Sequence, residues 1–227
     1  MKILNFADMK SAIGKILLLL VLLLPQIPAK GQMKIYTRSY MIQDFKSRTT
    51  KVVLDGPAEL VSALRDEVTS LWTVSPYEFC TPAQYEKQKG TAGTYFLHPV
   101  TSKGIICLVL TMGGKEIDLV SVPVAGEHYS GSLQYMAAFI SIVQDYVESA
   151  IVSERVAYAG ISAIRTHRPA GVRVICDPSE ASAAFRSGDE SVAVEIVITP
   201  DGSSGTRPRY RYRVNAGNYK LYSFIKL

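Results

Sequence analysis

The feature that most constrains the fold is an alternation of strand-like and helix-like segments between residues 51 and 97. We expect strands at 51–54, 73–79 and 94–97 and helices at 57–72 and 81–90. Apolar residues of the first helix recur at intervals of three and four, and the second helix starts with a capping Thr81 followed by a proline. This β-α-β-α-β order predicts parallel strands joined by right-handed crossovers.

The pattern then changes to a hairpin and a long helix. Gly113-Gly114 separates two β-rich segments, 105–112 and 116–124, and a glycine pair suits the tight turn between antiparallel strands. A helical stripe follows over 133–167. Even 30 residues of unbroken helix would extend about 45 Å, which is long for a domain of this size, so we expect a break between residues 153 and 160.

The last third of the chain is again β-rich. A strand at 172–176 and a short helix near 180–185 precede three strands at 191–199, 206–214 and 219–227. Turn-forming residues separate the last three, which predicts an antiparallel meander. The sequence as a whole predicts an α/β fold in which helices cover a mixed β-sheet, in a three-layer α/β/α arrangement.

The first 31 residues have the pattern of a signal peptide. Lysines precede an apolar run at 16–24, prolines follow it, and Ala29-Lys30-Gly31 matches a signal-peptidase site that leaves Gln32 as the new N-terminus. Nine apolar residues are too few for a bilayer core, which takes about 20 in a helix. We therefore expect cleavage, export to the periplasm or the medium, and no membrane span afterwards. An uncleaved signal anchor is the alternative.

Removal of this leader changes the charge of the chain. The leader contains four lysines and one aspartate, so 21 basic and 19 acidic residues remain of the 25 and 20 in the whole chain. This near balance gives no reason to expect a nucleic-acid partner. Residues 32–50 read as a polar lead-in segment with room for an edge strand, and residues 51–227 read as a single α/β domain.

The cysteines favour a structural role. Cys107 and Cys176 lie in β-rich segments, where a free cysteine behaves as a small hydrophobic residue, and Cys80 follows a strand end. We expect all three to be reduced, with one disulfide or a reactive thiol as alternatives. No Cys-x-x-Cys pair supports a thiol oxidoreductase.

The clearest pattern in the exported part is an arginine run at residues 207–213. In a strand, the two-residue period places four arginines on one face, about 7 Å apart: Arg207, Arg209, Arg211 and Arg213. Such a row of planar donors suits phosphate, sulfate or carboxylate groups. The alternative is a solvated strand face whose charge discourages edge-to-edge pairing, with Glu195 opposite one arginine.

Other motifs carry less chemical information. The segment Gly126 to Ser132 has the glycine spacing of a phosphate loop but lacks its lysine, so we expect a loop with Ser130 or Ser132 as helix cap. The histidines at 98, 128 and 167 have no metal-binding spacing, and we expect neither a metal nor a cofactor. The aromatic segment 72–79 is expected in the core, with a ligand groove around Glu78 as the alternative.

Two functional hypotheses follow. The first is an exported binding or assembly module, not a catalyst, that uses the arginine row to bind an anionic envelope polymer or a protein. The second is a hydrolase of envelope or extracellular substrates with its site at the carboxyl ends of the parallel strands. That site would bring together the Asp55-Gly56 turn, the Thr81 turn and a loop after Leu97 that includes His98.

Overall fold

A computed structural model describes residues 37–227 apart from 116, 127–130, 165 and 201–208. These residues belong to one compact unit, 34–227. The predicted signal peptide and its cleavage site lie outside the described residues, and so do Glu116, His128, Ser130 and Arg207.

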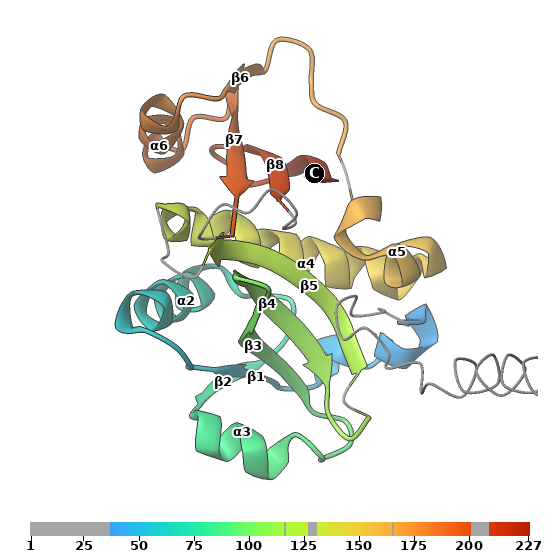
Figure 1. Cartoon of the computed structure of the whole chain (residues 1–227). Coiled ribbons are helices and arrows are strands. Elements are labelled where there is room, and N and C mark those ends of the chain that lie inside the picture. Colours follow the sequence, from blue (N-terminus) through green and yellow to red (C-terminus); the bar gives the residue numbers. More distant parts are fainter. Residues whose placement is uncertain (1–36, 116, 127–130, 165, 201–208) are drawn as a thin grey trace, which may run out of the picture. The chain divides into compact units, whose positions relative to one another are not determined.

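Helices and strands alternate through much of the chain (Figure 1). The strands are β1 (Thr50–Val53), β2 (Tyr77–Cys80), β3 (Tyr95–Ser102), β4 (Ile105–Met112), β5 (Ile117–Gly126), β6 (Arg173–Ile175), β7 (Val192–Ile198), β8 (Tyr210–Asn215) and β9 (Leu221–Lys226). The helices are η1 (Ser39–Ile42), η2 (Phe45–Ser47), α2 (Ala58–Leu71), α3 (Pro82–Gln88), η3 (Ser132–Tyr135), α4 (Met136–Val152), α5 (Glu154–Ala159), η4 (Gly160–Ala163) and α6 (Pro178–Ser187).

The first sheet has the strand order β2-β1-β3-β4-β5. Strand β1 pairs in parallel with β2 and β3, whereas β3, β4 and β5 pair antiparallel. Both the parallel start and the hairpin at Gly113-Gly114 are therefore confirmed. The hairpin needs its glycines, because Gly114 has a φ of 80° and a Cβ on Gly113 would lie 2.6 Å from the carbonyl oxygen of Thr91.

Helices cover both faces of this sheet. On one face, Leu60, Leu64 and Val68 of α2 join α4 in the main hydrophobic core. On the other face, α3 contributes Tyr85 to a smaller cluster with Phe96 and neighbouring strand residues. Helix α3 begins where predicted, with Thr81 in a capping box with Gln84.

The long helical segment breaks where predicted. Helix α4 ends at Val152, and the Ser153 side chain accepts a hydrogen bond from the N–H of Val156 to start α5. Many residues of α4 are fully buried, including Phe139 and Tyr146. This helix is thus the centre of the core.

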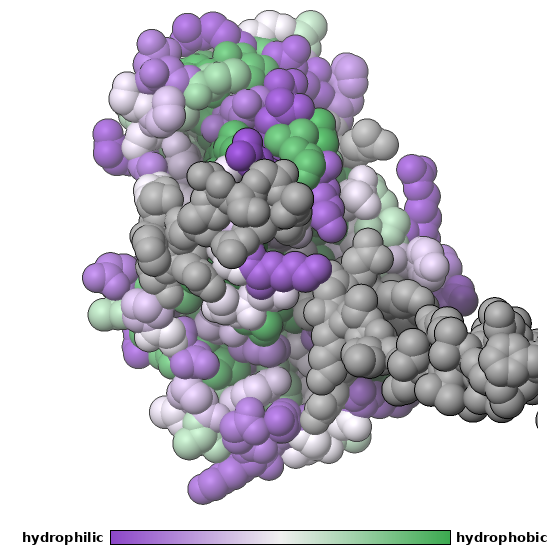
Figure 2. Space-filling model, viewed as in Figure 1, coloured by the Kyte–Doolittle hydropathy of each residue, from purple (hydrophilic) through white to green (hydrophobic). Residues whose placement is uncertain are grey.

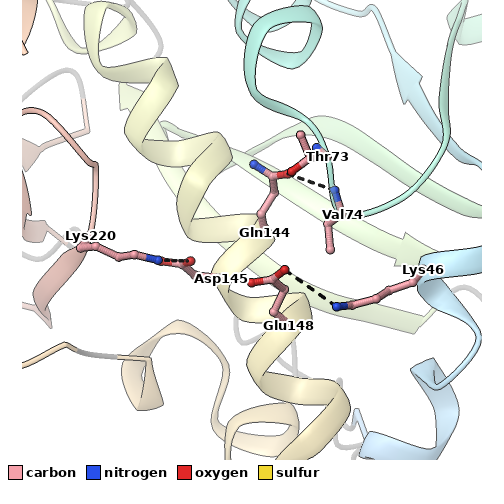
Figure 3. A network of polar contacts seen from close by, with 7 residues as sticks. All are labelled: Lys46, Thr73, Val74, Gln144, Asp145, Glu148 and Lys220. Atoms are coloured by element: carbon pink, nitrogen blue, oxygen red, sulfur yellow. Dashed lines mark hydrogen bonds and ion pairs between the residues drawn. The ribbon is translucent and has the colours of Figure 1, made fainter.

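The polar side of α4 holds the segment that leads from α2 to β2 (Figure 3). Gln144 Oε1 accepts hydrogen bonds from the backbone N–H groups of Thr73 (2.7 Å) and Val74 (3.2 Å). Its amide nitrogen donates to the carbonyl oxygen of Leu71 at 3.0 Å. One glutamine side chain therefore satisfies three backbone groups at the end of α2.

Two ion pairs connect α4 to segments distant in the sequence (Figure 3). Asp145 pairs with Lys220, between β8 and β9, at 2.9 Å. One turn later, Glu148 lies 3.8 Å from Lys46 of η2. The Asp145 pair contributes to holding the C-terminal strands against the helix.

The C-terminal strands form a second sheet with the order β6-β7-β8-β9. Strands β7, β8 and β9 make the predicted antiparallel meander, and β6 pairs in parallel with β7. The α/β class is confirmed, but the strands are divided between two mixed sheets. Strand β5, at the edge of the first sheet, contains Pro123, which has no N–H to offer a further strand.

Residues 37–49 of the lead-in segment contain no strand, and residues 32–36, where the possible edge strand could also fall, lie outside the described residues. Two short 3-10 helices, η1 and η2, bury Ile42 and Phe45 completely in the main core. Asp44 accepts a 2.8 Å hydrogen bond from the Tyr95 hydroxyl. The apolar residues of this segment are scattered and lack strand periodicity, and they pack into the core from short helical turns.

The cysteines are all free, as expected, but one differs in burial. Cys80 is buried and Cys107 is half-buried, whereas Cys176 is exposed just after β6. The prediction that Cys176 is a core residue is wrong, because the strand ends at Ile175, one residue earlier. Burial raises the pKa of the Cys80 and Cys107 thiols, which disfavours the reactive thiolate.

Candidate binding face of the C-terminal sheet

The arginine run lies partly in β8, between β7 and β9. Arg211 and Arg213 are strand residues, and Arg209 continues the ladder through two backbone hydrogen bonds with Leu227, of 2.8 and 3.5 Å. Strand alternation therefore places these three arginines on one face. Arg207, the fourth predicted member, lies outside the described residues.

The strand register identifies the neighbours of the arginines. Arg211 lies between Val197 of β7 and Ile225 of β9, and Arg213 lies between Glu195 and Ser223. We use the name arginine face for the surface formed by Arg209, Arg211, Arg213, Glu195, Val197 and Ile225.

The arginines differ in their ionic partners. The guanidinium of Arg213 donates from Nε to Glu195 at 2.9 Å, which confirms the expected pairing of Glu195 with one arginine. The Glu195 side chain is only 14% exposed, and that of Arg213 is 41% exposed. Within the described part of the chain, no carboxylate lies within ion-pair distance of Arg209 or Arg211, and the buried Arg211 Nε has no hydrogen-bond partner.

Apolar side chains flank Arg211 on both sides. Val197 is 48% exposed and Ile225 is 40% exposed, which is unusual for large aliphatic residues in a sheet. In Figure 2, the upper part of the molecule, which contains the C-terminal sheet, presents apolar surface bordered by hydrophilic surface. A cation between two apolar side chains is less well solvated than one among polar groups, and an anion there meets less screening.

The opposite face of the same sheet is fixed in the core. Tyr212 is fully buried, and its hydroxyl donates a 2.8 Å hydrogen bond to the carbonyl oxygen of Pro123 in β5. Its ring contacts Phe139 of α4 and Phe224 of β9. The strand that carries the arginines is therefore fixed to the core through its opposite face.

A second group of polar side chains occupies the first sheet, on the face that also carries Tyr85 of α3. His98 Nε2 lies 2.9 Å from Thr111 Oγ1, and the Thr111 hydroxyl donates to Asp118 Oδ1 at 3.1 Å. Because this hydroxyl has one hydrogen, it accepts from His98, which assigns the Nε2–H tautomer to the neutral imidazole. The His98 ring stands 4.9 Å from the ring of Tyr85.

Burial controls the charge states of this group. Desolvation lowers the pKa of His98 to about 4, although the negative charge of Asp55 raises it somewhat. Desolvation also raises the pKa of Asp118, against the hydrogen bond from Thr111. Asp55 and His98 thus lie within electrostatic range, as the hydrolase hypothesis expects, whereas Thr81 is occupied in its helix cap. The prediction of a loop after Leu97 is wrong, because β3 continues to Ser102 in its pairing with β4 and His98 is a strand residue.

Several other predicted site residues have structural roles. Trp72 is buried in the core, as expected, and donates from its indole nitrogen to Ser75 at 3.2 Å. Glu78 pairs with Lys51 across β1 and β2. Ser132 lies within η3, whose N-cap is Gly131 without a side-chain cap, so Ser132 is not the predicted cap.

The apolar members of the arginine face and the partners of His98 were not predicted from the sequence. Val197 and Ile225 belong to predicted strands, but only the register places both beside Arg211. Thr111 and Asp118 lie opposite each other across the predicted hairpin, and that pairing was a usable signal. Their connection to His98 depends on the β3–β4 pairing, for which the sequence contains no local signal.

Comparison of the chain with protein-family models, curated proteins and solved structures found no match in any of the three. Over the described ranges, no helix is long and apolar enough to cross a membrane. The same residues contain no cluster of three or more side chains suited to a metal ion.

Proposed function

We propose that the chain is an exported binding module whose arginine face binds an anionic partner. The observation that carries this proposal is the pair Arg209 and Arg211, two cations without ion-pair partners among the described residues, on a sheet face outside the main core. Guanidinium groups form strong, planar hydrogen bonds with carboxylates, sulfates and phosphates.

Two further features support the proposal. The backbone of β8 is held by strands on both sides and by the buried Tyr212, so the arginine side chains project from a fixed backbone. The leader pattern of residues 1–31 supports export to a compartment that contains acidic polymers and proteins.

The test of binding uses the mature chain, residues 32–227, with heparin and polyglutamate as anionic probes. We expect the double variant R209E/R211E to lose binding to both. The control is R155E/R186E, which makes the same charge change at exposed helix positions on α5 and α6. Equal losses in the two double variants would show a general charge effect and would refute the site.

The test of export is mass spectrometry of the protein recovered from an exporting host. Cleavage predicts a chain that starts at Gln32. A chain that retains residues 1–31 in the membrane fraction would instead support the signal-anchor alternative.

The hydrolase hypothesis is retained as a second candidate because one observation favours it. His98 is neutral at physiological pH and lies near Asp55 at the end of the parallel strands. A histidine with a carboxylate in its neighbourhood is typical of general acid–base sites. If this candidate is correct, hydrolysis of an ester or glycoside substrate disappears in H98Q while R209E/R211E retains it.

A further inference from the structure

The chemistry beside the arginines restricts the partner of the arginine face. The register forms a row of three side chains across the strands, with Arg211 between Val197 and Ile225. Both aliphatic side chains are at least 40% exposed, and Leu227, opposite Arg209, is 57% exposed. The described residues include six exposed large hydrophobic side chains, and three of them lie here: Val197, Ile225 and Leu227.

A simple polyanion does not match this row. Sulfated or carboxylated glycans and polyphosphates satisfy the guanidinium groups, but they offer no aliphatic surface to Val197 and Ile225. The burial of apolar surface is worth about 25 cal/mol per Å², and this contribution needs a partner with apolar side chains. Exposed apolar patches bordered by polar groups are typical of protein interaction sites.

We infer that the partner is an acidic protein surface in which carboxylates are flanked by apolar side chains, and this inference rests on the proposed function. A carboxylate of the partner pairs with Arg211, and apolar side chains on both sides cover Val197 and Ile225. Adjacent strands are about 4.8 Å apart. Helix neighbours at i+3 and i+4 are about 5–6 Å apart, so an acidic helix laid across the strands fits this spacing.

The test compares three labelled probes by fluorescence anisotropy with the mature chain. The first is a helical peptide with leucine, glutamate and leucine at positions i, i+3 and i+7 on one face. The second has the same composition with glutamates and leucines on opposite faces, and the third is polyglutamate. We expect the first to bind about tenfold more tightly than the other two, which corresponds to about 1.4 kcal/mol.

The variant V197T/I225T isolates the apolar contribution, because threonine keeps the β-branched shape that suits a strand. We expect it to remove the preference for the first peptide and to leave polyglutamate binding unchanged. V152T, at an exposed site at the end of α4, is the control and is expected to keep the preference.

The outcomes separate this inference from the proposed function. Equal affinities for all three probes, all lost in R209E/R211E, would overturn the acidic protein surface and leave an anion-binding face. A preference that persists in V197T/I225T would also overturn it. Binding of every probe unchanged in R209E/R211E would overturn the proposed function as well.

Discussion

The polar side chains of the two sheets differ in how they are paired. Each sheet has one face in the main core and another face that carries charged or polar side chains. In the first sheet, these side chains satisfy one another: Lys51 pairs with Glu78, and Thr111 connects His98 to Asp118. In the second sheet, Glu195 pairs with Arg213, and among the residues that the structure describes no carboxylate pairs with Arg209 or Arg211.

This difference favours the arginine face over the polar group of the first sheet as a binding site. Buried polar groups that are hydrogen-bonded to one another contribute to stability and specificity of the fold. Charged groups held on a fixed strand without a partner contribute little to stability and are available to a ligand. Exposed apolar residues alone do not identify a binding face. Tyr40 and Tyr158 are also exposed, but they lie near Arg38, whose charge is paired with Glu154 at 2.9 Å.

The largest expected effect concerns acid stability of the first sheet. His98 has a pKa of about 4 in the folded protein and about 6.5 in the unfolded chain, so the unfolded state binds the proton more readily. The contribution of neutral His98 to the unfolding free energy is fully present above pH 6.5 and is lost as the pH falls to 4. The shift corresponds to about 3 kcal/mol of unfolding free energy.

Urea unfolding at pH 7 and pH 4 measures this loss. The matched variant is H98Q, which cannot be protonated and is expected to lose about 3 kcal/mol less than the wild type over the same interval. The carboxylates Asp44 and Asp189, whose pKa values are lowered in the fold, weaken both proteins alike on acidification. Identical pH profiles for the two proteins would contradict the structural assignment of His98.

The next effect concerns the hydroxyl between the two titratable groups. T111V removes the partner of both His98 and Asp118 in a partly buried site, and we expect a loss of about 1–3 kcal/mol in unfolding free energy. T111S keeps the hydroxyl and is expected to lose less. If valine and serine are equivalent by urea unfolding, the hydrogen bonds do not stabilise the sheet.

A smaller effect is expected on the second sheet. E195Q removes the charge that neutralises Arg213, and the unfolding free energy should fall by about 1 kcal/mol or less. Heparin affinity should rise, because three unpaired arginines then share the face. An affinity that falls in E195Q would mean that Glu195 positions the arginines and that its neutralising effect is secondary.

The sequence was sufficient for most of the local structure. Turn and capping residues such as Gly114, Thr81 and Ser153 act within a few positions, and the elements that they begin or end occur where predicted. The alternation in the arginine run likewise identified a strand face correctly for Arg211 and Arg213.

Contacts between distant segments were not predictable in the same way. The division into two sheets depends on which strand edges meet, and the apolar neighbours of Arg211 depend on the register of three strands. The burial of Ile42 and Phe45 depends on tertiary packing and leaves no periodic signal. The long-range arrangement of side chains therefore needed the structure.

The central claim is that Arg209 and Arg211 serve binding and not folding. The most direct test measures heparin affinity and urea unfolding of R209Q/R211Q beside the wild type. We predict that affinity falls at least about tenfold while the unfolding free energy stays within about 0.5 kcal/mol. Unchanged affinity, or a loss of stability above about 1 kcal/mol with affinity retained, would contradict the claim.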